Sequence, residues 1–132
     1  MAIFYNKLQR KNPLRPEEPA KWYPVVKTAS MMREKEVARQ IADETTLNPK
    51  EAEMALSQLQ KVMIRALLNG QSVQLGDWGS FYLTLNAEGS ETEAEATPSK
   101  IKKVNIRFSV GTELKDALKK ASFTDAASLS KK

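Results

Sequence analysis

The segment NPKEAEMALSQLQKVMIRALLNGQSVQLGDWGSFYLTL, residues 48–85, contains the change of hydrophobic period that decides the fold. Its first residues, Asn48 to Glu51, combine a capping side chain, a proline at the first helical position and an acid three residues after the cap, which predicts the start of a helix. Apolar residues then follow at spacings of three and four as far as Leu67. After Gly70 apolar and polar residues alternate, which predicts a β-hairpin with its turn at residues 76–79.

The flanking sequence predicts a helix before this segment, and a strand and a last helix after it. A helix capped by Ser30 and ending near Thr45 would form a helical hairpin with the next one. Residues 103–108 alternate between basic or polar and apolar side chains, which predicts a third strand with one apolar and one basic face. A final helix is expected over 113–121, and residues 122–132 are expected to form a flexible tail.

Two segments do not fit this core. Residues 86–99 hold four glutamates and no base, which predicts a mobile loop; with its flanks, residues 86–103, it would form an arm. Residues 1–30 are interpreted as an N-terminal extension, with a strand at its start and an extended proline-rich loop over 12–24. Trp22 and Tyr23 in that loop are expected to dock on the body of the protein, which is the domain of residues 31–121.

The composition argues against an enzyme. The 132 residues include no cysteine and no histidine, which excludes disulfides and thiolate metal sites and removes the commonest general base. We therefore expect no catalytic activity, no cofactor, no bound metal and no small-molecule substrate. The absence of a long apolar run and of a signal-like N-terminus favours a cytoplasmic protein with no membrane partner.

The formal net charge is +5, and the basic residues gather toward the ends of the chain. Residues 1–33 hold seven lysines and arginines against two glutamates, whereas residues 34–70 are nearly balanced. Such asymmetry suits a polyanionic partner, because neutralising phosphates releases condensed counterions. From charge alone, a basic surface that only keeps the protein soluble explains the pattern equally well.

The predicted order of elements is helix, helix, strand, strand, arm, strand, helix, which is an α+β unit of about 90 residues. A three-stranded antiparallel sheet with one apolar face has little to close against in a single chain of this size. Small chains commonly gain stability by pairing. We therefore expect a homodimer.

Three stretches of this unit resemble the HU/IHF family of histone-like bacterial DNA-bending proteins. They are Thr46 to Glu53 at the second helix, Val73 to Phe81 at the hairpin, and Phe108 to Leu118 at the end, in the family's order and spacing. The resemblance implies the HU-like fold: a helical hairpin, a three-stranded sheet with a β-arm and a C-terminal helix, in an intertwined homodimer. It places the family's buried aromatic positions at the dimer interface, here Trp78, Phe81 and Phe108.

The resemblance further implies a histone-like protein of the nucleoid that binds double-stranded DNA with little sequence preference and condenses it. The N-terminal extension and the acidic arm are similar to an extended subgroup of HU-like proteins. The arm departs from the family, because it lacks the basic residues and the Arg-Asn-Pro motif whose proline wedges between base steps. Pro98 is interpreted as a turn residue.

The remaining candidates for DNA contact are the cations of the returning strand and of the last helix: Lys100, Lys102, Lys103, Arg107 and Lys115. These side chains also fit a solvated basic face that touches nothing. The functional alternative is accordingly a structural or protein-interaction homodimer of HU fold that has lost DNA bending.

Overall fold

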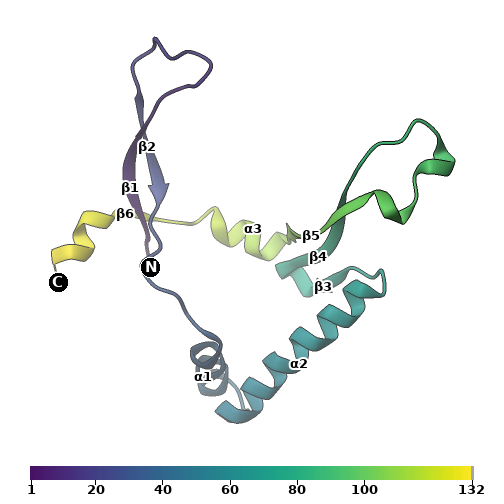
Figure 1. The fold of residues 1–132 in the computed structure, drawn as a ribbon. Coiled ribbons are helices and arrows are strands. Elements are labelled where there is room, and N and C mark those ends of the chain that lie inside the picture. Colours follow the sequence, from purple (N-terminus) through teal and green to yellow (C-terminus); the bar gives the residue numbers. More distant parts are fainter. Residues whose placement is uncertain (132) are drawn as a thin grey trace. The chain divides into compact units, whose positions relative to one another are not determined.

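The computed structural model describes residues 1–131 and divides into two compact units (Figure 1). The first unit combines Met1–Met32 with the residues from 118 onward, and the second is Arg33–Ala117. The second unit nearly coincides with the domain predicted over 31–121. The ends of the chain form a unit together, so the N-terminal extension and the C-terminal segment are parts of one structure.

Two helices open the second unit, α1 (Glu34–Glu44) and α2 (Pro49–Leu68). The cap predicted at Asn48 is present, since its side chain accepts a hydrogen bond of 2.9 Å from the backbone N–H of Glu51. The cap predicted at Ser30 is wrong: the N-cap of α1 is Arg33, three residues later, and the two acids in the first turn, Glu34 and Glu36, complement the helix dipole. The helices pack through Ala38 and Ala52, each 1% exposed.

Strands β3 (Val73–Leu75), β4 (Gly79–Ala87) and β5 (Ile101–Val110) form an antiparallel sheet in the order β3-β4-β5. The predicted turn is a 3₁₀ turn over Gly76–Trp78. The register opposes apolar residues on one face, Phe81 to Phe108, Leu83 to Ile106 and Leu85 to Val104. The other face opposes Tyr82 to Arg107 and Asn86 to Lys103, as the alternation predicted.

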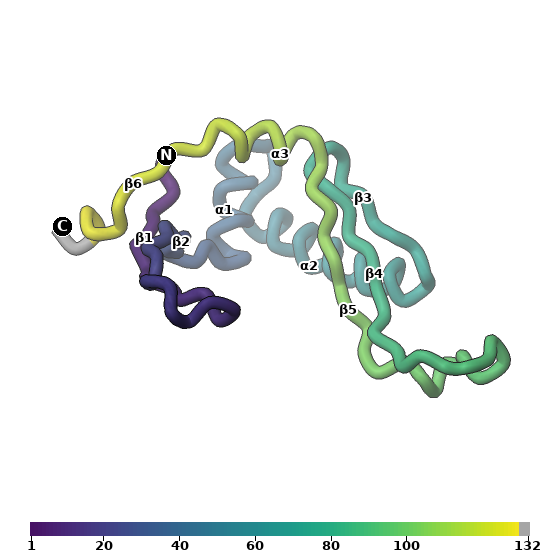
Figure 2. The backbone as a smooth tube through the Cα atoms, turned by 90° about the horizontal axis from the view of Figure 1, so that it is seen from above, coloured from purple at the N-terminus to yellow at the C-terminus, as the bar shows by residue number. Residues whose placement is uncertain are grey.

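The arm lies between β4 and β5 and extends beyond the ends of both strands (Figure 2). A register shift at Asn86 and Ala87 ends the regular pairing at its base. Its outer part holds two short 3₁₀ turns, Glu93–Glu95 and Pro98–Lys100, the second of which begins at the proline expected to occupy a turn.

Helix α3 (Thr112–Leu118) follows β5 and is three residues shorter at its end than predicted. The Gly111 N–H donates to the carbonyl of Trp78 over 2.8 Å, and a Cβ at Gly111 would collide with the backbone of Asp77. Only glycine allows this close approach between the start of α3 and the turn that precedes β4.

The first unit is a second sheet, formed by β1 (Ile3–Arg10), β2 (Lys21–Val26) and β6 (Phe123–Asp125) in the order β2-β1-β6. β2 corrects the loop predicted over 12–24, because a proline is tolerated on an edge strand and Pro24 pairs with Lys7 there. Trp22 and Tyr23 therefore lie in a strand.

β6 corrects the flexible tail predicted over 122–132 for its described part, residues 122–131; Lys132 lies outside the described residues. It pairs with β1 in parallel, and the Ile3 N–H donates to the carbonyl of Ser122 over 2.8 Å. The Ser122 hydroxyl also donates to the carbonyl of Met1. A 3₁₀ segment, Ala126–Lys131, follows. The C-terminal segment is thus tied to the N-terminal strand by backbone hydrogen bonds.

Few side chains are buried in a single chain. Among the described residues, Ala38 and Ala52 are the hydrophobic residues that form the buried core, and no large side chain is fully buried. No helix in this part of the chain has the length and apolarity needed to cross a membrane. The sheet of the second unit keeps an apolar face in solvent, with Val104 53%, Ile106 56% and Phe108 39% exposed.

Candidate nucleic-acid interface

Two of the five predicted DNA-contacting cations share one exposed face of the second unit's sheet. Lys103 and Arg107 lie on β5, four residues apart, and therefore project from the same side of the strand. Between them, the Asn105 side-chain amide donates a hydrogen bond of 3.2 Å to the side-chain oxygen Oδ1 of Asn86 on β4. Neither cation forms an ion pair within the described residues, so both charges are available to an anionic partner.

Lys102 lies at the irregular base of the arm and is already paired. Its Nζ lies 3.1 Å from a carboxylate oxygen of Glu88, and both side chains are more than half exposed. An exposed pair of this kind contributes at most about 1 kcal/mol, so phosphate could displace Glu88 at small cost. Lys100 is half-buried, and its carbonyl accepts the Glu88 N–H over 2.9 Å. The acidic arm thus competes for the ammonium of Lys102.

The fifth candidate, Lys115, lies on α3 and is exposed. It belongs to a different element from the other four candidates, which lie on β5 or in the arm. Its backbone N–H donates to the carbonyl of Gly111 over 3.0 Å. The structure therefore separates the candidates into a pair on the sheet, two residues at the arm and one on the last helix.

The arm itself is a negative segment. Glu91, Glu93 and Glu95 form no ion pair within residues 1–131, and all three are exposed. Their carboxylates would repel phosphate at any point where the arm approached a duplex. The geometry agrees with the departure noted in the sequence.

The three aromatic residues predicted for the dimer interface form one cluster beside the apolar face. The ring centroids of Phe81 and Phe108 are 4.9 Å apart, and the Trp78 ring lies 6.0 Å from the first and 5.8 Å from the second. These distances are typical of favourable ring contacts. Trp78 remains 48% exposed, so the cluster presents aromatic surface outward.

On α1, the charge of Arg39 is neutralised by acidic side chains of the same helix. The Arg39 guanidinium donates hydrogen bonds to Glu36 and, over 3.0 Å, to Asp43. The hydrogen bonds from Arg39 and Gln40 hold the pKa of Glu36 below its ordinary value, and Glu36 in turn raises the pKa of Arg39. This arginine is occupied by its own helix. No group of three or more acidic side chains in the described residues lies together in a way that could hold a metal ion.

The family model for the HU domain fused to wHTH, Ig, or Glycine-rich motif matches residues 1–125. The chain belongs to this HU-HIG family. The match extends over both units, so the N-terminal sheet lies within the region that the family model describes. The resemblance to HU-like proteins is thereby confirmed.

Two solved structures are similar to this HU-HIG chain. A putative bacterial DNA binding protein from Bacteroides vulgatus ATCC 8482 has a TM-score of 0.63 and 11% identity over 93% of this chain and 48% of that one. This chain thus spans about half the length of that relative. The Anabaena HU-DNA cocrystal structure has a TM-score of 0.52 and 20% identity over 66% of this chain and 97% of the other. Comparison with curated protein sequences finds no match. At these identities the likeness shows the fold.

The charge of the two units is the feature that residue-by-residue reasoning missed. Residues 1–32 and 118–132 together hold ten lysines and arginines against three acids, a net charge of +7. Residues 33–117 hold eleven lysines and arginines against thirteen acids, a net charge of −2. The signal was visible in the gathering of bases at both ends of the sequence, but only the pairing of β1 with β6 brings those ends into one unit.

Proposed function

We propose that this protein is a histone-like DNA-binding protein without catalytic activity, which binds duplex DNA as a homodimer with little sequence preference. A single observation carries the proposal: one HU-like sheet has exposed cations on one face and an uncovered apolar face on the other. The apolar face suits a second copy of the chain, and the polar face, with Lys103 and Arg107, suits phosphates.

The homodimer is supported by the amount of apolar surface left in solvent. Within a single chain, Trp78 and Phe108 of the aromatic cluster keep roughly two fifths to half of their surface exposed, at 48% and 39%. The neighbouring Ile106 and Val104 are exposed by more than half. A contiguous apolar surface of this kind is typical of a subunit interface.

Low sequence preference is supported by the described residues 1–131, among which no element is suited to reading bases. α3 has seven residues, and the arm has acidic side chains where a minor-groove reader carries arginine. Contacts to the DNA backbone would then dominate, with an affinity of micromolar order or weaker at physiological salt. A protein that condenses chromosomal DNA in this way would act in the cytoplasm, at the nucleoid.

The test is titration of the full chain with labelled duplexes of unrelated sequence at two salt concentrations. We expect similar affinities for all duplexes and a linear fall of log affinity with log salt. Affinities that differ by more than about 10³-fold between sequences would indicate specific readout and contradict the proposal. So would an absence of binding at low salt.

Two observations favour a second function, a structural or protein-interaction homodimer. The HU-like unit has a net charge of −2, and one of its cations, Lys102, is paired with Glu88 of the arm. A chain that sediments as a dimer but leaves every duplex unbound would establish this alternative.

A further inference from the structure

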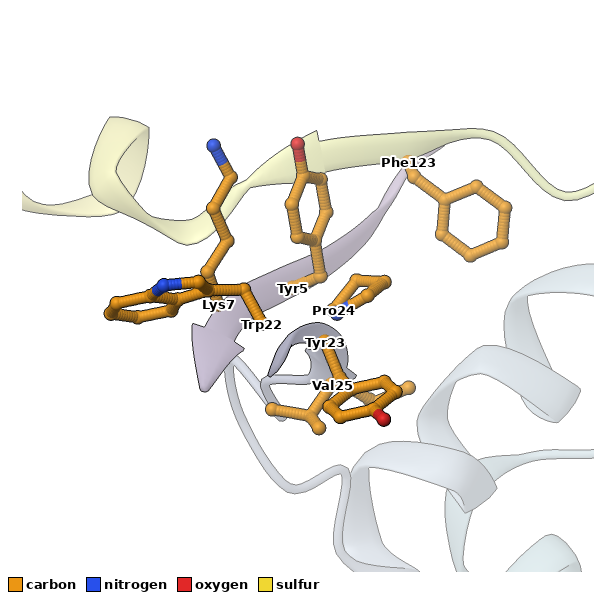
Figure 3. A pocket seen from close by; sticks show the side chains of 8 residues that line it. Tyr5, Lys7, Trp22, Tyr23, Pro24, Val25 and Phe123 are labelled. Carbon is orange, nitrogen blue, oxygen red and sulfur yellow. The ribbon is translucent and has the colours of Figure 1, made fainter. Parts of the chain in front are cut away.

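The sheet of the first unit carries a hollow of about 640 Å³ whose walls are mainly aromatic and aliphatic (Figure 3). A hollow of this size falls within the range of ligand-binding clefts. The residues that matter for its chemistry are Tyr5, Lys7, Trp22, Pro24, Val26 and Phe123, which we call the aromatic face.

The register of the strands explains why these residues share a face. Tyr5 opposes Val26 and Lys7 opposes Pro24 across β1 and β2, so their side chains project from the same side of the sheet. Phe123 joins them from β6, where it is the partner of Ile3. Figure 3 shows the Tyr5 and Lys7 side chains pointing the same way from β1.

The aromatic face is open to solvent in the chain. Trp22 is 66% exposed, Phe123 64% and Val26 71%. Large aromatic side chains seldom stay this exposed on a surface without a binding role. Because a tryptophan and a phenylalanine present flat apolar surface, the face suits planar partners that can stack on it.

The charge of the unit selects among the possible partners. The strands and the loop between them contribute Lys7, Arg10, Lys11, Arg15 and Lys21, within a unit of net charge +7. Against these bases stand three acids: Glu18, which pairs with Arg15 over 3.1 Å, Glu17, and Asp125, which opposes Tyr5 in the register of β1 and β6. An anionic partner is therefore favoured, and a second copy of the same unit is disfavoured by repulsion between two charges of +7.

We propose that the aromatic face binds unpaired bases of single-stranded DNA. Bases stack on Trp22 and Phe123, while the ammonium of Lys7, whose side chain lines the same hollow, meets the phosphates. Duplex DNA does not use this face, because its bases already stack on one another and cannot reach a flat protein surface without being unpaired. The inference goes beyond duplex binding by the sheet of the second unit and uses residues outside that sheet.

The experiment measures the anisotropy of fluorescein-labelled oligo(dT) of about 15 nucleotides and of a labelled duplex, each titrated with the full chain. Trp22→Ala is expected to weaken oligo(dT) binding by about five- to 150-fold, the loss that corresponds to one stacked base. Trp22→Phe, which keeps a flat ring, should retain most of the affinity. Duplex affinity should stay within about twofold for both variants, well below the loss of one stacked base.

A matched pair of charge variants tests the role of Lys7. Lys7→Gln removes a charge from the aromatic face, and Lys21→Gln removes the same charge from the opposite face, where Lys21 pairs with Arg10. Only the first is expected to reduce oligo(dT) affinity beyond the general effect of one lost charge. Equal losses from the two would show that the lysine acts only through the net charge and would overturn its placement at the phosphates.

Other results would overturn the proposal as a whole. Equal losses from Trp22→Ala and from Leu8→Ala, a change on the other face of β1, would remove the aromatic face from the binding site, provided both variants melt at the temperature of the unmodified protein. A Trp22→Ala variant with changed sedimentation and unchanged oligo(dT) affinity would identify the face as a contact between copies. Tighter binding of oligo(rU) than of oligo(dT) would assign the aromatic face to RNA. If the chain binds oligo(dT) as expected but does not bind the labelled duplex, the proposed function is contradicted and this inference still stands.

Discussion

Replacing Ile106 with lysine gives a direct test of the homodimer. Ile106 lies on the apolar face of β5 and is 56% exposed in a single chain. In a monomer this would be an ordinary surface substitution, which typically changes the free energy of unfolding by no more than about 0.5 kcal/mol. In a dimer closed over this face, the same change would place an ammonium group inside the interface.

The expected magnitude follows from that exposure. Fully burying an isoleucine side chain is worth about 1.5–3 kcal/mol, so covering the exposed half is worth about 1 kcal/mol or slightly more in each chain. Two-fold symmetry doubles this loss, and desolvation of two ammonium groups adds several kcal/mol. We expect the dissociation constant of the dimer to rise by about 10³-fold or more, since each 1.4 kcal/mol is a factor of ten.

Sedimentation velocity at micromolar concentration measures the outcome. The unmodified chain should sediment as two copies of 14.8 kDa, and Ile106→Lys should shift it toward one copy or an unfolded chain. Ser109→Lys is the matched control, because it adds the same charge to the same strand but on the opposite face, where Ser109 pairs with Ser80. An unmodified chain that is a folded monomer, or equal effects of the two substitutions, would refute the reasoning.

Three further predictions concern DNA and stability. Changing both Lys103 and Arg107 to glutamine should flatten the slope of log affinity for duplex against log salt by about two units per subunit at most. The control Lys61→Gln, on α2, should leave the slope unaltered. An unaltered slope in the double variant would show that neither side chain touches DNA. The four arm glutamates are Glu88, Glu91, Glu93 and Glu95. Changing all four to glutamine should raise the affinity for duplex DNA without bending the duplex, because the apolar wedge that kinks a base step is still missing. A large fall in the end-to-end distance of the bound duplex, measured by fluorescence transfer, would contradict this. Asn48→Ala should cost about 1 kcal/mol of unfolding free energy in thermal melts, since it removes the cap of α2, and Asn48→Asp should cost less.

The elements that the sequence predicts correctly are those with local causes. The start of α2 follows from the Asn48 side chain and its hydrogen bond to the Glu51 N–H, three residues away. The faces of β4 and β5 follow from alternation within each strand, and this alternation also brings Phe81 opposite Phe108. Each of these features depends on neighbours that a short window of sequence contains.

The elements that it misses depend on distant partners. β6 has three residues, too few to show a period, and it becomes a strand only because β1 lies beside it from the other end of the chain. β2 contains Pro24, which argues for a loop unless the strand is known to be at an edge. Among the candidate DNA contacts, the pairing of Lys102 with Glu88 depends on a register shift that alternation cannot reveal.

The division of charge between the two units bears on how such a chain can hold DNA. In the HU-like unit the bases do not outnumber the acids, so the pair Lys103 and Arg107 acts against a background that repels phosphate. The unit formed by the chain ends has an excess of seven positive charges and an aromatic surface. If attraction to phosphates rises with the number of cations engaged, cations of the terminal unit outside the aromatic face add to the contacts proposed for Lys103 and Arg107. If two chains pair as proposed, the cations of both terminal units would engage the same DNA at a raised effective concentration. Ile106→Lys should therefore weaken duplex binding even though Ile106 lies on the face opposite the cations.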